Sequence, residues 1–173
     1  MTALDIFTAI KAAVAAIPLD AGLGTAGEPL FEAVELAANR DLPRQLQELL
    51  VVKKRACLIV PVAVRRPVPD GSGALSVLGR KFAEIALLYS DQAYFKPSQS
   101  VTFGDAQRLG LFGFDEKIEA ALTGRELSPF GGLVFADSQP VLFTEEESAR
   151  LGGRHAWFIT AYVPLGLIAE PVL

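Results

Sequence analysis

The side chains that catalysis and metal binding use most are scarce in this chain. It has one histidine, His155, and one cysteine, Cys57, among 173 residues. A histidine base needs a nearby nucleophile, and a zinc site needs several closely spaced ligands. No serine or second cysteine is spaced to pair with His155, and no zinc-type spacing is present. We therefore expect no catalytic residues, no metal ligands and no cofactor.

The settings of these two residues favour structural roles. Cys57 lies within the apolar run RACLIVPVAV, which indicates a small buried hydrophobic residue in a strand. His155 stands between Arg154 and the apolar stretch AWFITAYV, which indicates a partly exposed histidine at a strand end. An alternative is a small ligand-binding or enzymatic domain with a pocket beside Trp157 and His155.

Two acidic stretches are the other candidates for acid/base chemistry. DEKIEAALTGREL begins with Asp115, Glu116, Lys117 and Glu119. Glu116 and Glu119 lie one helical turn apart, but the neighbouring lysine indicates an ordinary solvated helix face. The run TEEESAR, residues 144–150, is typical of a solvated first helical turn or of a turn between strands.

One glycine pattern matches a nucleotide-binding spacing. GLGTAG, residues 22–27, has the form G-x-G-x-x-G, which must follow a strand and open a helix to hold a pyrophosphate. Here a predicted helix and Pro18 precede it, and Glu28 and Pro29 follow. The context favours a flexible connector.

The basic residues are spread rather than clustered. KKR, residues 53–55, and RR, residues 65–66, stand at the two ends of one predicted strand. The net charge of −4 argues against a protein that coats nucleic acid. In a monomer these are scattered surface cations, whereas in a ring Arg65 and Arg66 would repeat into a belt facing an acidic partner or passing DNA.

Bulk composition bounds the class of protein. The length predicts a single domain over residues 1–173. Hydrophobic residues make up 51% of the chain, yet no run reaches the length of a membrane span. Asp5 and Lys11 argue against a cleaved signal, so we expect folding in the cytoplasm. The apolar surplus indicates surface that is buried against other protein.

Periodicity predicts the elements that position these residues. The expected helices are 3–17, with Leu4, Phe7, Ile10, Val14 and Ile17 as its apolar stripe, then a short one over 31–37, then 41–50, and 114–122. The expected strands are 55–66, 80–90, 131–136, 139–144 and 154–163. We expect a linker at 18–30 and a flexible loop at 67–79. This order predicts an α+β fold, a mainly antiparallel sheet flanked by helices.

The helix around residue 114 has the clearest boundaries. Asp105 could cap it, but Gly110 and Gly113 each disfavour a helix by about 1 kcal/mol, so we expect it to begin near Phe114. Phe114, Ile118, Ala121 and Leu122 form its inward stripe. Gly124 stands where a helix end takes a left-handed backbone.

The order of several segments resembles the tail terminator proteins of tailed bacteriophages, above all the Mu-like minor tail protein group of contractile tails. The resemblance covers roughly residues 3–165 and rests on segments that begin with ALDIFTAIKAAV and ACLIVPVAVRR, followed by FAEIALLY, GLFGFDEKIEAALTGREL and PVLFTEEESARLGGRHAWFITAYV. It departs from the group in the linker and in the C-terminal PLGLIAEPVL, residues 164–173, which we expect to serve over 165–173 as an arm reaching a neighbour.

The resemblance implies a structural virion protein without enzymatic activity. It implies a hexameric ring that caps the tail tube and sheath and docks the head-side connector, in the neck region of the tail. Its partners would be other copies of itself, the tube protein, and the sheath and connector proteins, with DNA passing at most transiently through the lumen and no membrane. A neck, tail-completion or baseplate component is the alternative.

A head-to-tail ring needs two different complementary patches on each subunit. We expect them in the loop 67–79 and in the aromatic segment 94–114, because aromatic residues favour interface cores. The predicted interface residues are Arg65, Arg66, Tyr94, Phe95, Phe103 and Phe112.

Overall fold

The computed structural model describes residues 2–19, 27–65, 80–93, 103–104, 109–129 and 131–167. The helices in these ranges are α1 (Ala3–Ala15), α2 (Leu42–Val52), α4 (Leu111–Leu122) and α5 (Glu145–Arg150). The strands are β1 (Ala33–Leu36), β2 (Arg55–Arg65), β3 (Arg80–Asp91), β4 (Glu126–Ser128), β5 (Gly131–Gly132), β6 (Val134–Pro140) and β7 (Trp157–Leu167). None of these helices is long and apolar enough to cross a membrane.

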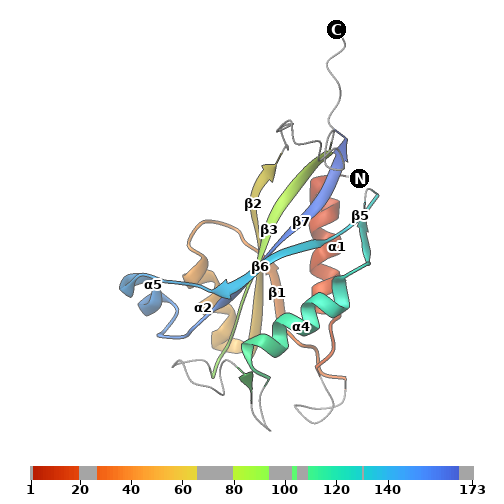
Figure 1. Cartoon of the computed structure of the whole chain (residues 1–173). Helices are drawn as coiled ribbons and strands as arrows, with labels where there is room; N and C mark the ends of the chain where they lie inside the picture. Colours follow the sequence, from red (N-terminus) through yellow and green to blue (C-terminus); the bar gives the residue numbers. More distant parts are fainter. Residues whose placement is uncertain are drawn as a thin grey trace.

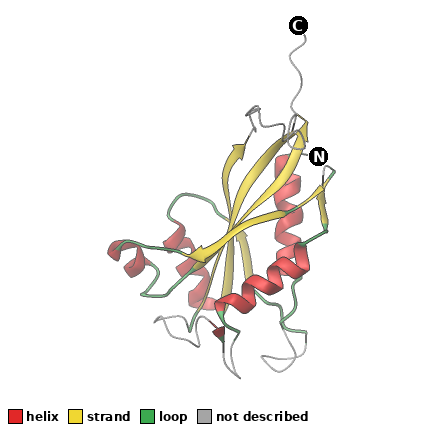
Figure 2. Cartoon of the chain, viewed as in Figure 1, coloured by secondary structure: helices red, strands yellow, loops and turns green. Residues whose placement is uncertain are grey.

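Five strands form the main sheet in the order β1-β2-β3-β7-β6, and β4 pairs with β5 separately. β1 runs parallel to β2, and every other neighbouring pair in the main sheet is antiparallel. Helices α1 and α4 lie on one face of this sheet, and α2 and α5 lie on the other (Figures 1 and 2). The predicted α+β fold with a mainly antiparallel sheet is confirmed.

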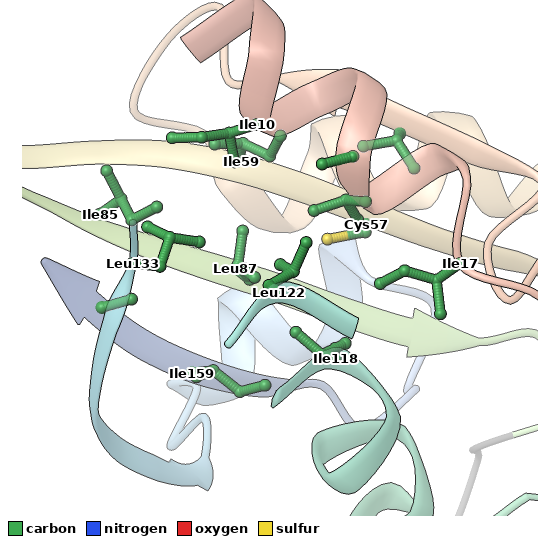
Figure 3. Close-up of a cluster of buried hydrophobic side chains, with 14 of the residues drawn as sticks. Ile10, Ile17, Cys57, Ile59, Ile85, Leu87, Ile118, Leu122, Leu133 and Ile159 are labelled. Atoms are coloured by element: carbon green, nitrogen blue, oxygen red, sulfur yellow. The ribbon is translucent and has the colours of Figure 1, made fainter. Parts of the chain in front are cut away.

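The larger core lies between the sheet and helices α1 and α4. Branched aliphatic residues of the strands point at these helices, as Figure 3 shows for Ile59, Ile85 and Ile159. Beside them Phe31, Tyr89 and Phe114 form a ring cluster with centroids 5.5–5.7 Å apart. The Tyr89 hydroxyl donates to the carbonyl oxygen of Leu111, 3.2 Å away, so its one polar atom is satisfied inside the core.

The smaller core lies under α2 and α5 and covers only part of the opposite face. Its buried members are Leu46, Leu50, Ala56, Leu58, Leu88, Leu151 and Ala156. All of its strand residues come from one end of the sheet. Toward the other end the same face carries Glu84 and Tyr162, by the alternation of side chains along β3 and β7. Among the described residues, neither core cluster includes a helix packed on that half of the face.

Local signals explain where the first two helices begin. At α1 the Thr2 hydroxyl accepts from the Asp5 N–H, and the Asp5 carboxylate accepts from the Thr2 N–H, which is a capping box. At α2 the Asp41 carboxylate caps the first turn, and Pro43 fits there because the first helical N–H groups have no partner inside the helix. The predicted stripe of α1 is wrong at Leu4, which is 67% exposed, whereas Ile6 is buried.

Helix α4 begins at Leu111, earlier than the predicted start at Phe114. Gly113 lies inside this helix. Any larger residue at this position would place its Cβ within 2.4 Å of the Leu109 side chain. Close packing of Leu109 therefore explains the glycine. The predicted inward stripe is confirmed for Phe114, Ile118 and Leu122, which are buried. Gly124 has φ +73°, the left-handed backbone that its position predicts.

Two predicted secondary-structure assignments are wrong. The expected helix at 31–37 is strand β1, because Val34 points into the core beside β2 while Glu35 points outward. The expected strand at 139–144 is not formed: β6 ends at Pro140, and the chain leaves the sheet toward α5.

The boundaries of the predicted linker and C-terminal arm also change. The ends of 18–30 are anchored, since Leu19 N–H donates to Glu28 and Leu30 N–H donates to Ile17. β7 starts at Trp157 and runs to Leu167, so 165–167 belong to the sheet rather than to an arm. The loop 67–79, Asp105 and residues 20–26 of the linker lie outside the described residues.

The ring cluster predicts a large mutational effect. Phe114→Ala should lower the free energy of unfolding by about 3–5 kcal/mol, because it leaves a cavity between Phe31 and Tyr89. Leu142→Ala is the control, since Leu142 is 92% exposed and should change stability by less than about 0.5 kcal/mol. Urea unfolding followed by circular dichroism measures both; equal effects would contradict this account of the core.

Candidate functional site

Cys57 and His155 are the two residues that could serve as nucleophile and base, and the structure places them in different settings. Cys57 is fully buried, and burial raises the pKa of its thiol far above the ordinary value, so the reactive thiolate is suppressed. His155 is partly exposed and precedes β7, as predicted, and its carbonyl oxygen accepts from the Ser90 hydroxyl at 2.6 Å. Among the described residues no group of three or more His, Cys, Asp or Glu side chains could hold a metal ion.

Arg55 corrects the prediction of scattered surface cations. Its side chain is 10% exposed, and its Nη2 donates to Glu28 Oε1 at 2.6 Å. Its Nε donates to the carbonyl oxygen of Leu30 at 2.8 Å, and Glu32 lies 3.7 Å away. Arg55 therefore joins the segment before β1 to the start of β2. Sequence reasoning missed this role because its partners lie more than twenty residues away in the chain.

The acidic run 144–150 forms helix α5 and its cap, one of the two predicted readings. The Thr144 hydroxyl accepts from the Glu147 N–H, and the Glu147 carboxylate accepts from the Thr144 N–H. These hydrogen bonds lower the pKa of Glu147 below its ordinary value of 4.5. Arg150 pairs with Glu146 on the same helix and with Asp41 at the start of α2. The run therefore has a structural task.

The predicted interface residues fall into separate regions. Phe103 and Phe112 stack with ring centroids 5.5 Å apart, and Phe112 contacts Trp157 at 5.7 Å. Phe103 is 71% exposed and Phe112 is 44% exposed, so this aromatic stack reaches the surface. Arg65 lies at the opposite end of β3 from these rings and pairs with Glu84.

Arg66, Tyr94 and Phe95 lie outside the described residues. The structure thus brings Phe103 and Phe112 together and keeps Arg65 away from them.

An acidic hollow lies beside the outer edge of β6. Its volume is about 180 Å³, and it is lined by Asp115, Glu119, Phe135, Ala136, Asp137, Ser138 and Ile159. Asp115 and Glu119 come from α4, and Asp137 comes from β6. The Trp157 Nε1 donates to the Ser138 hydroxyl, which joins the aromatic stack to this hollow. The sequence suggested the pair Glu116 and Glu119, whereas the hollow selects Asp115 because it lies one turn before Glu119 on the same helix face.

A second hollow lies at the other side of the sheet, where β1 ends. Its volume is about 340 Å³, and it is lined by Ala37, Ala38, Asn39, Arg40, Leu42, Val60 and Pro61. β1 pairs with β2 only as far as Ile59, so the outer edge of β2 continues past this hollow from Val60 to Arg65 without a partner strand among the described residues. Neither hollow is lined by Trp157 or His155.

Both sheet edges expose aliphatic residues. Val62 is 51% exposed and Val64 is 48% exposed on β2, and Val134 is 58% exposed on β6. Sequence analysis missed these edges, because strand order cannot be read from alternation alone. One signal was available: Asp137 interrupts an apolar run, which is typical of an edge strand.

The solved structures that this chain is similar to include a sheath/tube terminator. That protein belongs to an extracellular contractile injection system, PVC, and its structure was solved in the extended state. The identity is 14% and the TM-score is 0.41; the match covers 100% of this chain and 62% of the terminator, so the chain spans less than two thirds of its length. No protein-family model and no curated protein matches the sequence.

The role of sheath/tube terminator belongs to that protein, and the likeness assigns no role to this chain.

Arg55 gives a prediction for stability. Arg55→Met should lower the free energy of unfolding by about 3–5 kcal/mol, because Glu28 and the Leu30 carbonyl lose a buried donor. Arg44→Met is the matched control, since Arg44 is 71% exposed and its pair with Glu48 on α2 contributes about 0.3–0.5 kcal/mol. Comparable losses in denaturant unfolding of the two variants would refute the structural role of Arg55.

The cap of α5 gives a prediction for pH. Because the folded-state pKa of Glu147 is depressed, its contribution to stability is present above pH 4.5 and is lost as the pH falls through the folded-state pKa. Thr144→Ala removes the hydroxyl and should move the pKa of Glu147 back toward 4.5. The backbone N–H at position 144, the larger cause of the lowered pKa, remains in the variant, so the return is partial. A carboxyl NMR titration of both proteins measures this shift, and an unchanged Glu147 pKa in the variant would rule out the Thr144 hydroxyl as a cause.

Proposed function

We propose that this chain is a non-enzymatic structural subunit that forms a ring and terminates a contractile, phage-type tail. The ring caps the end of the tube and its sheath and offers a docking face to the head-side connector, in the neck region of a virion. The tail-terminator assignment draws on the sequence resemblance, and the ring-forming part draws on the surface of the fold.

The observation that carries the ring is the pair of unpaired sheet edges. Exposed edges with apolar residues invite pairing with another chain, and natural proteins usually cover or blunt them. Here β6 on one side and the end of β2 on the other remain open among the described residues, with Val62, Val64 and Val134 exposed. Two different open patches on one subunit are what a head-to-tail assembly requires.

The uses of the polar residues support a role without catalysis. Cys57 is buried in the core, Arg55 joins two segments, and Glu147 caps a helix. Each of these side chains has a structural task, so none is left poised for proton transfer or nucleophilic attack. The polar groups that remain available, such as the carboxylates of the acidic hollow, lie on the surface, where contacts with another protein can use them.

The aromatic stack is the surface we assign to a partner other than this chain. Phe103, Phe112 and Trp157 lie at the start of β7, away from the open stretch of β2 at the other end of β3. Exposed aromatic rings are favoured at the centres of protein interfaces. We assign this end of the subunit to the tube.

A direct experiment tests the proposed function. Native mass spectrometry and negative-stain electron microscopy of the purified protein should show closed rings, alone or after mixing with purified tubes of a contractile tail. On tubes, the density should lie at one end only, because a terminator binds the last ring of a growing tube.

The Phe112→Ser variant separates the two surfaces. It should keep the ring while weakening tube binding by about tenfold or more, since loss of an aromatic anchor costs about 2 kcal/mol. Glu116→Ser, an exposed position on the same helix, is the matched control. A protein that stays monomeric at every concentration and never binds tube ends would overturn the proposal.

A further inference from the structure

We propose that subunits join head to tail through their sheet edges, with β6 of one subunit adding to the open stretch of β2 in the next. This inference rests on the proposed ring-forming function and names the contact that builds the ring. The occupant of each open edge is a second copy of this chain.

Strand direction fits such a junction. β3 is antiparallel to β2, β7 is antiparallel to β3, and β6 is antiparallel to β7. β6 therefore runs opposite to β2. When a neighbour is placed by rotation about an axis along the strands, the β6 edge of one copy meets the β2 edge of the next in antiparallel orientation, and the alternation of the sheet continues across the contact.

The levels of the two edges also match. Ala63, Glu84, Tyr162 and Val134 form one row across the sheet. The free stretch of β2 therefore stands at the same height as the beginning of β6. A head-to-tail contact without a shift along the axis closes into a ring, whereas a shifted one grows into a filament. On this level Val134–Asp137 of one subunit stand opposite Val60–Ala63 of the next, and Pro61 contributes no N–H to the new ladder.

The charges of the two edges are complementary. Asp137 on the β6 edge forms no ion pair with the residues that the structure describes. It pairs with Thr160 in the row of Val60, so by the alternation of strand side chains it stands on the same face of the sheet as Val60, whereas Asp115 and Glu119 belong to α4 on the other face. The hollow at the β2 edge is lined by Arg40, which is exposed and likewise has no ion pair within the described ranges.

The register places these opposite charges at the same height. Asp137 lies in one row with Val60, and Val60 lines the hollow of Arg40. Level docking therefore brings Asp137 of one subunit to Arg40 of the next. A contact that matches direction, level and charge is satisfied by a copy of this chain itself.

A charge swap tests the pairing. Asp137→Arg and Arg40→Asp should each shift the protein from rings to monomers in native mass spectrometry at physiological salt, by about tenfold or more in the association constant. The double variant should restore the ring, because the attraction returns with the signs exchanged. Glu145→Arg, an exposed charge reversal on α5, is the matched control and should leave the ring intact.

Cysteine cross-linking tests the geometry without changing charge. Within one chain Val134 and Ala63 are separated by three strand spacings, about 14 Å, which no disulfide can bridge. Oxidation of the Val134→Cys, Ala63→Cys double variant should therefore give a ladder of linked subunits on a non-reducing gel, and each single variant should give none. Cys57 stays unreactive because it is buried.

The outcomes separate the inference from the function. Suppose that the wild-type protein forms rings, that both single charge-reversal variants also form them, and that the double cysteine variant gives no ladder. This result would overturn the edge-to-edge contact and leave the ring-forming function standing. Dimers without higher species in the double cysteine variant would also overturn it, because they indicate a symmetric contact. A wild-type protein that never forms rings would remove both. Unchanged circular dichroism of each variant verifies that it folds.

Discussion

The pairing of β3 on both of its edges is the constraint on which the rest of the structure depends. β3 bonds to β2 on one side and to β7 on the other over nearly its whole length. This double pairing aligns the side chains of β2, β3 and β7 into rows, and β6 joins them by pairing with β7. The helices pack on the two faces of the sheet. Two edges remain open: β1 is too short to pair with all of β2, and no described strand pairs with the outer edge of β6.

The same sheet divides the polar residues into two groups. Those near the well-covered end are used internally, as when Ser90 donates to His155 and Arg55 donates to Glu28. Buried polar groups must be paired, because an unpaired one costs about 1–3 kcal/mol. At the edges, water satisfies the charges, so Arg40 and Asp137 remain available for another chain. The polar residues at the covered end of the sheet thus stabilise the fold, and those at its edges are available for contacts with another chain.

The apolar surface follows the same division. The apolar faces of the four helices are buried in the two cores. Valines on β2 and β6 and the rings of Phe103 and Phe112 nevertheless remain exposed. Exposed edge strands favour association, and a specific neighbour is the way to cover them without aggregation. The aromatic stack and the edges lie at different places on the subunit, which suits a protein that contacts its own copies and a separate partner.

The sequence by itself determined the elements whose signals are local. The stripe of Phe114, Ile118 and Leu122, the left-handed Gly124 and the long apolar runs of β2 and β3 follow from periodicity and backbone sterics within one element. Only the tertiary structure decided that Ala33–Leu36 is a strand, that Arg55 is buried and that Asp115 lines a hollow with Asp137. These features depend on partners far away in the chain, since a short segment takes its conformation from the strand it pairs with, and a charge is buried only where distant groups satisfy it.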